Sequence, residues 1–386
     1  MKEDNTTSCD SSAKSLGRQR NITKRRILRG VIASLTVASA FRDLSTLEDI
    51  KPKQSDCQPD TGNVPTLTTN ASIFPHPPHF TSLSEIFPRY KHSQSMKYSC
   101  WYNAPMHHPH FLQQLLRCFS LWESQPSDNP RILYVPKRQF WRKIGNTAIF
   151  DRDFPISSAI LKTLTTSYNV TVTNSWSDST PLKVQRMTEV DEFVSPFAMA
   201  SQEDATRWKD QFRLPREEEP ITRRTKKRLK IVIVNRPFGR KLLNAWDARE
   251  SIATAFPGHD VFLHQMNDAS NATLYEMLEF FPTVDILVSP HGSQLTGIMF
   301  MQRCSAVLEI FPHLYWTPWY FSSLARIFQL PHANWYVSNQ TEPQHMHDLH
   351  TRMANSGNNM CLSTKILASA VDELIRKRQI CLDSMI

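Results

Sequence analysis

The stretch from Ile231 to Pro312 decides the fold, because short apolar runs alternate there with amphipathic segments. It reads IVIVNRPFGRKLLN at 231–244, DILVSPHGSQLT at 285–296 and AVLEIFP at 306–312. Continuous apolar runs are typical of buried parallel strands, and helical spacing marks the segments between them. The pattern predicts strands at 231–234, 261–263, 285–289, 306–310 and 334–337. It predicts helices at 245–256 with Asn244 as N-cap, at 272–281, from His291 onward and at 317–329. Such alternation predicts a doubly wound parallel sheet in an α/β fold.

The same alternation continues outward from this stretch. In the N-terminal half it predicts helices at 111–123, 156–164 and 201–212, and strands at 132–135 and 168–172. The segment 213–230 contains two prolines, three consecutive glutamates and a basic run, which favours a linker. We predict that residues 1–60 form a cytoplasmic tail, a signal-anchor or signal peptide, and a stem. Two α/β domains follow at 61–212 and 231–345, and the linker at 213–230 joins them. Residues 346–386 are predicted to form a C-terminal tail with a closing helix.

Composition narrows the classes of protein that fit. The 386 residues include only 9 glycines, and neither GxGxxG nor GxxxxGK[ST] occurs, which disfavours glycine-rich nucleotide-binding loops. The net charge of +9 comes from two short basic runs, Lys14–Arg29 and Arg223–Lys230. When the 13 basic residues of these runs are left out, the chain has 32 basic and 36 acidic residues. We therefore predict no nucleic-acid partner.

The N-terminal region carries signs of secretory entry. Lys24-Arg25-Arg26 precedes an apolar run at 30–41, which is shorter than the roughly 20 residues that span a bilayer. The run resembles a signal-peptide core or a weak signal-anchor, and Ala38-Ser39-Ala40 fits a cleavage site. An organelle presequence is the alternative. Six N-x-[ST] sequons support the secretory prediction: Asn5, Asn21, Asn70, Asn169, Asn271 and Asn339. In an oxidising lumen, Cys361 and Cys381 are candidates for a disulfide.

Two polar segments follow predicted strands and together suggest an anion site. At the turn VSPHGSQLT (288–296), Gly292 allows close approach of the backbone, and the amides of Ser293 to Leu295 would point out of a helix N-terminus. His291 stands at the end of the strand. Arg236, Arg240 and Lys241 follow the strand at 231–234, and arginine pairs well with phosphate. An ordinary βα turn and a solvated basic loop are the structural alternatives.

Two further features could carry chemistry. Glu309 lies in an apolar strand and needs a partner, which could be ribose hydroxyls or a backbone amide. Three histidines at 107–110 precede the helix at 111–123. Their number suggests metal binding, but no cysteine or acidic ligand has a fitting spacing, so we predict no metal site. A histidine here could instead act as a general base or bind a donor phosphate.

Taken together, these segments resemble glycosyltransferase family 61. The family pattern is an apolar strand followed by N-R-x-x-x-R-x-x-x-N, then HG[AS]xLT, then V-x-E-[IL]-x-P and an aromatic helix. Here it appears as IVIVNRPFGRKLLN (231–244), VSPHGSQLTGIMFM (288–301), AVLEIFP (306–312) and YWTPWYFSSLA (315–325). The resemblance is clear over about 228–340 and weaker at HPHF (108–111). Within the family it is similar to protein O-mannose β-1,4-N-acetylglucosaminyltransferases, EGF-domain O-GlcNAc transferases and plant xylosyltransferase-like members.

The resemblance implies a GT-B-like fold, with two Rossmann-like domains and a cleft between them. It implies an inverting transfer of GlcNAc or a pentose such as xylose from a UDP-sugar to a hydroxyl of a glycan or glycoprotein, with no metal or other cofactor. It also implies a lumenal location in the Golgi or endoplasmic reticulum, either as a type II membrane protein held by its N-terminal anchor or as a secreted chain after cleavage. The alternative is a catalytically inactive relative that binds a sugar nucleotide or glycan.

The resemblance also assigns roles to individual residues. His110, His291 and Arg240 are the predicted catalytic residues, with His110 as the base that deprotonates the acceptor. Glu309 is predicted to hold the ribose. The predicted nucleotide-binding residues are Arg236, Arg240, His291, Gly292, Ser293, Gln294, Leu295 and Glu309.

Overall fold

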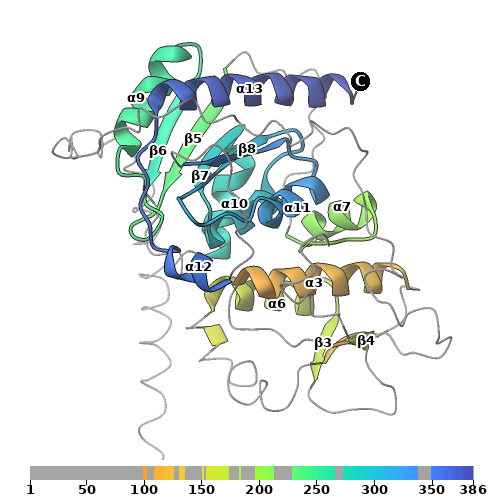
Figure 1. Cartoon of the computed structure of the whole chain (residues 1–386). Coiled ribbons are helices and arrows are strands. Elements are labelled where there is room, and N and C mark those ends of the chain that lie inside the picture. Colours follow the sequence, from red (N-terminus) through yellow and green to blue (C-terminus); the bar gives the residue numbers. More distant parts are fainter. Residues whose placement is uncertain are drawn as a thin grey trace, which may run out of the picture. The chain divides into compact units, whose positions relative to one another are not determined.

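The structure is a computed structural model of the chain (Figure 1). The residues that it describes all fall in one compact unit, Cys57–Ile386. They are 99–101, 108–125, 130–134, 150–151, 154–173, 182–183, 196–212, 228–265, 273–337 and 349–385. The predicted apolar run at 30–41 and most of the predicted linker lie outside these ranges. No helix within them is both long and apolar enough to cross a membrane.

A five-stranded parallel sheet forms the C-terminal half, as the sequence predicts. Its order is β6-β5-β7-β8-β9. The strands are β5 (Lys230–Asn235), β6 (Asp260–Gln265), β7 (Ile286–Pro290), β8 (Ala306–Phe311) and β9 (His332–Tyr336). The chain leaves β5 for β6 on one side and returns to β7 on the other, so the strand order reverses between β5 and β7.

The central strands β5, β7 and β8 are buried on both faces, which explains why they are largely apolar runs. Ile231 and Ile233 pack into a cluster with α9 (Ala245–Ala255) and α13 (Thr364–Asp383). Figure 1 shows α9 and α13 on the same side of the sheet. The alternate residues Val232 and Val234 belong to the cluster on the opposite face. That second cluster includes residues of α10 (Leu274–Phe280), η4 (Phe281–Thr283), η5 (Ser293–Phe300) and α11 (Trp319–Ile327).

The predicted start of α9 is confirmed, although its capping residue bonds elsewhere, whereas the helix predicted from His291 begins two residues later. Asn244 stands at the N-cap position of α9, but its side chain makes no capping bond. It pairs instead with the backbone of Leu362, donating to the carbonyl at 2.8 Å and accepting from the amide at 2.9 Å. The helix predicted from His291 is a 3-10 helix, η5, that begins at Ser293. The His291 amide donates to the Ile310 carbonyl at 2.8 Å, so this residue continues the sheet pairing of β7 with β8.

The N-terminal half contains a second parallel sheet of four strands in the order β3-β2-β1-β4. The strands are β1 (Ser99–Trp101), β2 (Arg131–Tyr134), β3 (Val170–Thr173) and β4 (Leu182–Lys183). The helices of this half are α3 (His108–Glu123), α6 (Pro155–Ser167) and α7 (Gln202–Asp210), as the apolar spacing predicts. Ser201 caps α7 by accepting a hydrogen bond from the Asp204 amide.

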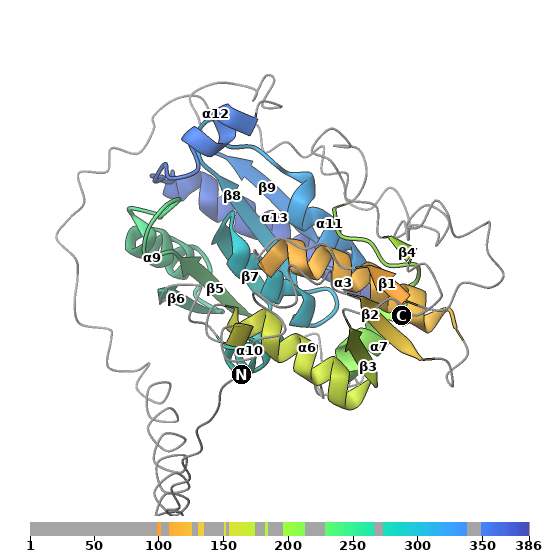
Figure 2. The ribbon, with the colours of Figure 1, turned by 90° about the horizontal axis from the view of Figure 1, so that it is seen from below.

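The N-terminal half packs directly on the C-terminal half. One continuous apolar cluster contains side chains from both, including Phe119 of α3 and Phe300 of η5. Polar bonds accompany this contact: the Phe197 amide donates to Ser323 Oγ at 3.1 Å, and Lys209 Nζ donates to the Met301 carbonyl at 2.7 Å. The start of α3 and the start of α11 are thereby held close together (Figure 2).

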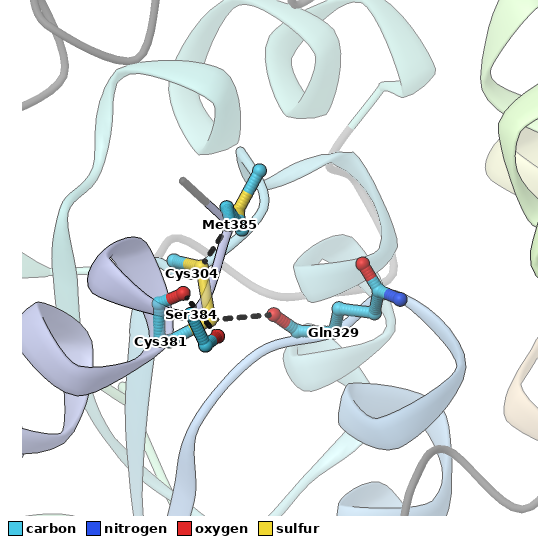
Figure 3. The surroundings of a disulfide bond; sticks show 5 residues. All are labelled: Cys304, Gln329, Cys381, Ser384 and Met385. Atoms are coloured by element: carbon cyan, nitrogen blue, oxygen red, sulfur yellow. Dashed lines mark hydrogen bonds between the residues drawn. A yellow bond between two sulfur atoms is a disulfide. The ribbon is translucent and has the colours of Figure 1, made fainter.

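A disulfide joins Cys304, just before β8, to Cys381 near the end of α13 (Figure 3). The sulfur of Met385 and the carbonyl of Gln329 lie beside it. The predicted Cys361–Cys381 bridge is therefore wrong, because packing α13 along the sheet brings its C-terminal end to Cys304. Cys118 and Cys361 each take part in a disulfide bond as well.

Candidate functional site

The candidate site lies where the strand order reverses, at the carboxyl ends of β5 and β7. In an open α/β sheet, ligands bind in the crevice at this point, because the loops from the two strands diverge there. The loop after β5 supplies Arg236 and Arg240, and the turn after β7 supplies His291 and Gly292. The structure therefore brings together the two segments that the sequence marks as an anion site.

Glu309 of β8 holds the imidazole of His291. Its Oε1 lies 2.5 Å from His291 Nδ1, and its Oε2 lies 3.1 Å from Nε2 of His332, the first residue of β9. The carboxyl group is fully buried, and burial raises the pKa of Glu309 well above its usual value, while the Arg240 charge acts in the opposite direction. Burial also lowers the pKa of His332 to about 3, so this imidazole is neutral.

The structure gives Glu309 partners in the protein that the sequence does not predict. The sequence predicts ribose hydroxyls or a backbone amide, but the carboxyl oxygens face two imidazoles. The sequence does not predict His332 as a residue of the site, because it stands 23 residues further along the chain. Only the fold reveals that its strand pairs with β8.

Arg236 lies over the turn at Gly292. Its Nη1 donates to the His291 carbonyl at 3.2 Å and lies 3.5 Å from Gln294 Oε1. The backbone of Gly292 is extended, so its φ angle alone would accept any residue. The requirement for glycine is steric, because a Cβ there would overlap Arg236 Nη1 and Gln294 Oε1. The close approach that the sequence predicts at Gly292 is thus made by an arginine of the protein itself.

Arg240 is the second half-buried cation of the site. Its guanidinium lies 4.9 Å from the centre of the Tyr315 ring, and its Nε is buried without a hydrogen-bond partner. Burial lowers the pKa of Arg240, and burial together with the nearby Arg240 charge lowers the pKa of Arg236 to about 10. Within the described residues, neither guanidinium forms an ion pair with a carboxylate. Two neighbouring cations that are partly desolvated and form no ion pair among the described residues make a site suited to an anion.

The amides at the start of η5 differ from the prediction at one position. The Leu295 amide donates to the Gly292 carbonyl at 3.0 Å, so the prediction of an exposed Leu295 amide is wrong. Ser293 and Gln294 are the first two residues of η5, and the first amides of a helix have no acceptor within it. The Gln294 side chain donates to the Pro290 carbonyl at 2.6 Å and so fixes the turn.

Tyr320 connects the two predicted catalytic histidines. Its hydroxyl lies 3.3 Å from His110 Nδ1, and its ring meets those of His110 and His291 edge to face, with centroids 6.1 Å and 6.0 Å apart. His110 is half-buried, and its Nδ1 also lies 2.9 Å from Gln113 Oε1. Burial raises the pKa of the Tyr320 hydroxyl, which keeps it protonated. Sequence reasoning missed this link, because His110 and Tyr320 are 210 residues apart.

Comparison with known families identifies the class of protein. A model of Glycosyltransferase 61 matches residues 78–308, which is more than half of the chain. The chain therefore belongs to glycosyltransferase family 61. The match begins well before the segment of clear sequence resemblance, so the N-terminal half belongs to the family pattern too. A comparison with the curated proteins found no match. Membership of this family implies the transfer of a sugar from a donor to an acceptor.

Proposed function

We propose that the protein transfers GlcNAc or a pentose such as xylose from a UDP-sugar to a hydroxyl group of a glycan or glycoprotein, with inversion and without a metal ion. The observation that carries the nucleotide part of this proposal is the pair of half-buried arginines, Arg236 and Arg240, beside His291 at the reversal of the strand order. A diphosphate supplies the negative charge that these cations lack. The sugar, the inversion and the independence from metal follow from the family resemblance.

In this proposal the diphosphate binds to the two guanidinium groups, to His291 and to the amides of Ser293 and Gln294. The same cations stabilise the charge that builds on UDP as it departs, and they act in a partly desolvated site where such stabilisation is strong. The Leu295 amide stabilises the turn and does not bind the ligand, because it already donates a hydrogen bond to the Gly292 carbonyl.

We further propose that the two parallel sheets correspond to the two Rossmann-like domains of a GT-B fold. His110 of the N-terminal half would then face the donor site from the acceptor side and remove the proton from the acceptor hydroxyl. Its contact with Tyr320 of the C-terminal half supports this assignment.

The proposal is tested by UDP binding and by turnover of UDP-sugars. We expect calorimetry to detect UDP binding, and we expect UDP release from UDP-GlcNAc or UDP-xylose in a screen of glycan and peptide acceptors. A protein that binds no UDP or UDP-sugar would contradict the function. Binding without transfer to any acceptor would favour the inactive relative, and unchanged turnover in His110→Ala would refute His110 as the base.

We also propose that the protein passes through the secretory pathway, and the disulfides of the structure support this compartment. Asn169 gives a sharp test. It is the one sequon asparagine among the described residues, and it is exposed in the turn between α6 and β3 with a φ of 53°. Thr171 of the same sequon is exposed on β3, an edge strand.

We expect Asn169 to carry an N-linked glycan when the full chain is expressed in eukaryotic cells. An N-glycosidase should increase the gel mobility of the wild-type protein, and the shift should be smaller in Asn169→Gln. The matched control is Thr166→Ala, which removes an exposed hydroxyl from α6 that belongs to no sequon. An identical shift in wild type and Asn169→Gln would show that this site is not used.

A further inference from the structure

We propose that Asn235 and Asn359 are positioning residues that hold the arginine loop, residues 236–242, in the conformation that forms the anion site. This loop follows β5 directly and carries Arg236 and Arg240. The sequence pattern assigns no role to either asparagine, and Asn359 lies beyond the residues that the family model matches. The inference rests on the proposed function for the identity of the ligand, whereas the hold on the loop is a property of the protein alone.

The side chain of Asn235 closes the arginine loop at its base. Asn235 is the last residue of β5, and only 1% of it is exposed. Its Nδ2 donates to the Leu242 carbonyl at 2.9 Å, and its Oδ1 accepts from the Leu242 amide at 2.8 Å. The same Oδ1 accepts from the Arg236 amide at 2.9 Å. One buried carboxamide thus joins the first and last residues of the loop, which requires the donor and the acceptor that asparagine combines.

Asn359 and Met360 hold the returning arm of the loop from the other side. The Lys241 amide donates to Asn359 Oδ1 at 3.1 Å, and the Lys241 carbonyl accepts from the Met360 amide at 2.8 Å. The Met360 carbonyl in turn accepts from the Leu243 amide at 2.8 Å, so the two segments pair as a short parallel bridge. The arm is therefore bonded to β5 through Asn235 and to a segment 118 residues further along the chain.

The arginine loop needs this hold, because its conformation is unfavourable by itself. Gly239 and Arg240 both have φ angles in the left-handed region, 56° and 57°. Glycine adopts this region readily, but in arginine the Cβ comes too close to the following carbonyl oxygen. The guanidinium groups of Arg236 and Arg240 are also partly desolvated and repel each other. Such a conformation persists only where the surrounding structure fixes the backbone, and the bonds from both sides of the arm do so here.

A loop held in this way strengthens anion binding by preorganisation. A ligand binds only the fraction of molecules in which both guanidinium groups face the site, and the apparent Kd rises as this fraction falls. A released loop that reached the binding conformation in about a tenth of the molecules would bind UDP about tenfold more weakly. Asn235 and Asn359 thus act on the diphosphate through the two arginines and not by contact with it.

The first test compares the UDP affinity of full-length variants by calorimetry. We expect Asn235→Ala to weaken UDP binding about tenfold, because the loop loses its closure at the base. We expect Asn359→Ala to weaken it about threefold, the loss typical of one hydrogen bond. Ser201→Ala, which removes the side-chain bond at the start of α7, is the control for lost stability and should bind UDP like the wild type. Asn358→Ala removes a neighbouring exposed carboxamide that bonds outside the loop, and it should do the same.

A double-mutant cycle separates positioning from a merely structural role. If Asn235 acts through the arginines, Asn235→Ala should cost clearly less affinity in the Arg240→Ala background than in the wild type, because one of the cations it positions is already gone. A structural role elsewhere would make the two losses independent. Equal losses in the two backgrounds would overturn the inference.

A second readout needs no ligand. Hydrogen exchange with mass spectrometry reports on the amides of Leu243 and Met360, whose acceptors do not belong to Asn235. We expect both amides to exchange faster in Asn235→Ala than in the wild type, because the returning arm detaches, while exchange in β7 stays the same. Unchanged exchange at both amides in a folded Asn235→Ala protein would overturn the inference.

Two further outcomes are decisive. Asn359 is exposed, so Asn359→Ala carries both measurements if Asn235→Ala does not fold, and wild-type affinity and exchange in this variant would then overturn the inference. A wild type that binds no UDP would refute the proposed function, whereas hydrogen exchange would still decide whether the asparagines hold the arginine loop.

Discussion

Arg240→Ala should weaken UDP binding by at least about 30-fold. Truncating one partner of a buried, charge-assisted contact costs about 2–5 kcal/mol, and about 1.4 kcal/mol corresponds to a factor of ten. The guanidinium is largely buried, its Nε has no hydrogen-bond partner, and it forms no ion pair with a carboxylate among the described residues. In the free protein its removal also relieves repulsion with Arg236, so we expect stability to be maintained while affinity falls.

Calorimetry with UDP measures this effect, and a thermal melt measures the stability. The matched control is Arg376→Ala, since Arg376 is an exposed arginine of α13 that pairs with Asp372 and Glu373. It should bind UDP like the wild type. Equal affinities for Arg240→Ala and the wild type would remove Arg240 from the site. A large loss of stability in Arg240→Ala would show that its charge is needed by the fold.

Two glycines close together in the chain should respond to alanine in opposite ways. A Cβ at Gly292 meets the ends of two flexible side chains, Arg236 and Gln294, which can move aside. We therefore expect Gly292→Ala to fold normally but to displace Arg236 and weaken UDP binding about tenfold or more, the loss typical of a hydrogen bond to a charged group. A Cβ at Gly297 meets the buried ring of Phe281, which has no such freedom. Overpacking of that kind costs about 1–3 kcal/mol of stability.

The comparison uses urea unfolding for stability and calorimetry for affinity. Gly258→Ala is the control, because a Cβ at Gly258 has no neighbour within 4 Å. It should change neither quantity. If Gly292→Ala lost stability while its folded form kept full affinity, the close contact with Arg236 would be a packing feature and not part of an anion site.

The five-stranded sheet could be predicted because its signal is local. The central strands β5, β7 and β8 are largely apolar runs buried on both faces, and the segments between the strands show helical spacing, so neighbouring residues are enough to identify them. The loop with Arg236 and Arg240 and the turn at His291 could also be placed together, since the carboxyl ends of parallel strands share one edge of the sheet.

The contacts that refine the site could not be predicted, because they join residues that are distant in the chain. Glu309 meets His332 only once β8 pairs with β9, and Tyr320 meets His110 only once the two halves pack. The Asn244 side chain illustrates the same limit. Its residue type and position favour a cap, but a loop 118 residues away competes for its amide group. The disulfide partner of Cys381 was likewise decided by where α13 lies.

The bond between Cys304 and Cys381 has a consequence for synthesis. All five strands of the C-terminal sheet precede α13 in the chain, so on the ribosome α9 alone covers one apolar face of the sheet until α13 emerges. During that interval the Cys304 thiol has no native partner, and the sheet is exposed to aggregation and to mispairing. Once formed, the bond closes a loop with a sequence separation of 77 and disfavours the unfolded chain by about 4.5 kcal/mol in a chain-entropy model. The arrival of α13 therefore completes the cover of this face and at the same time brings Cys381 to Cys304.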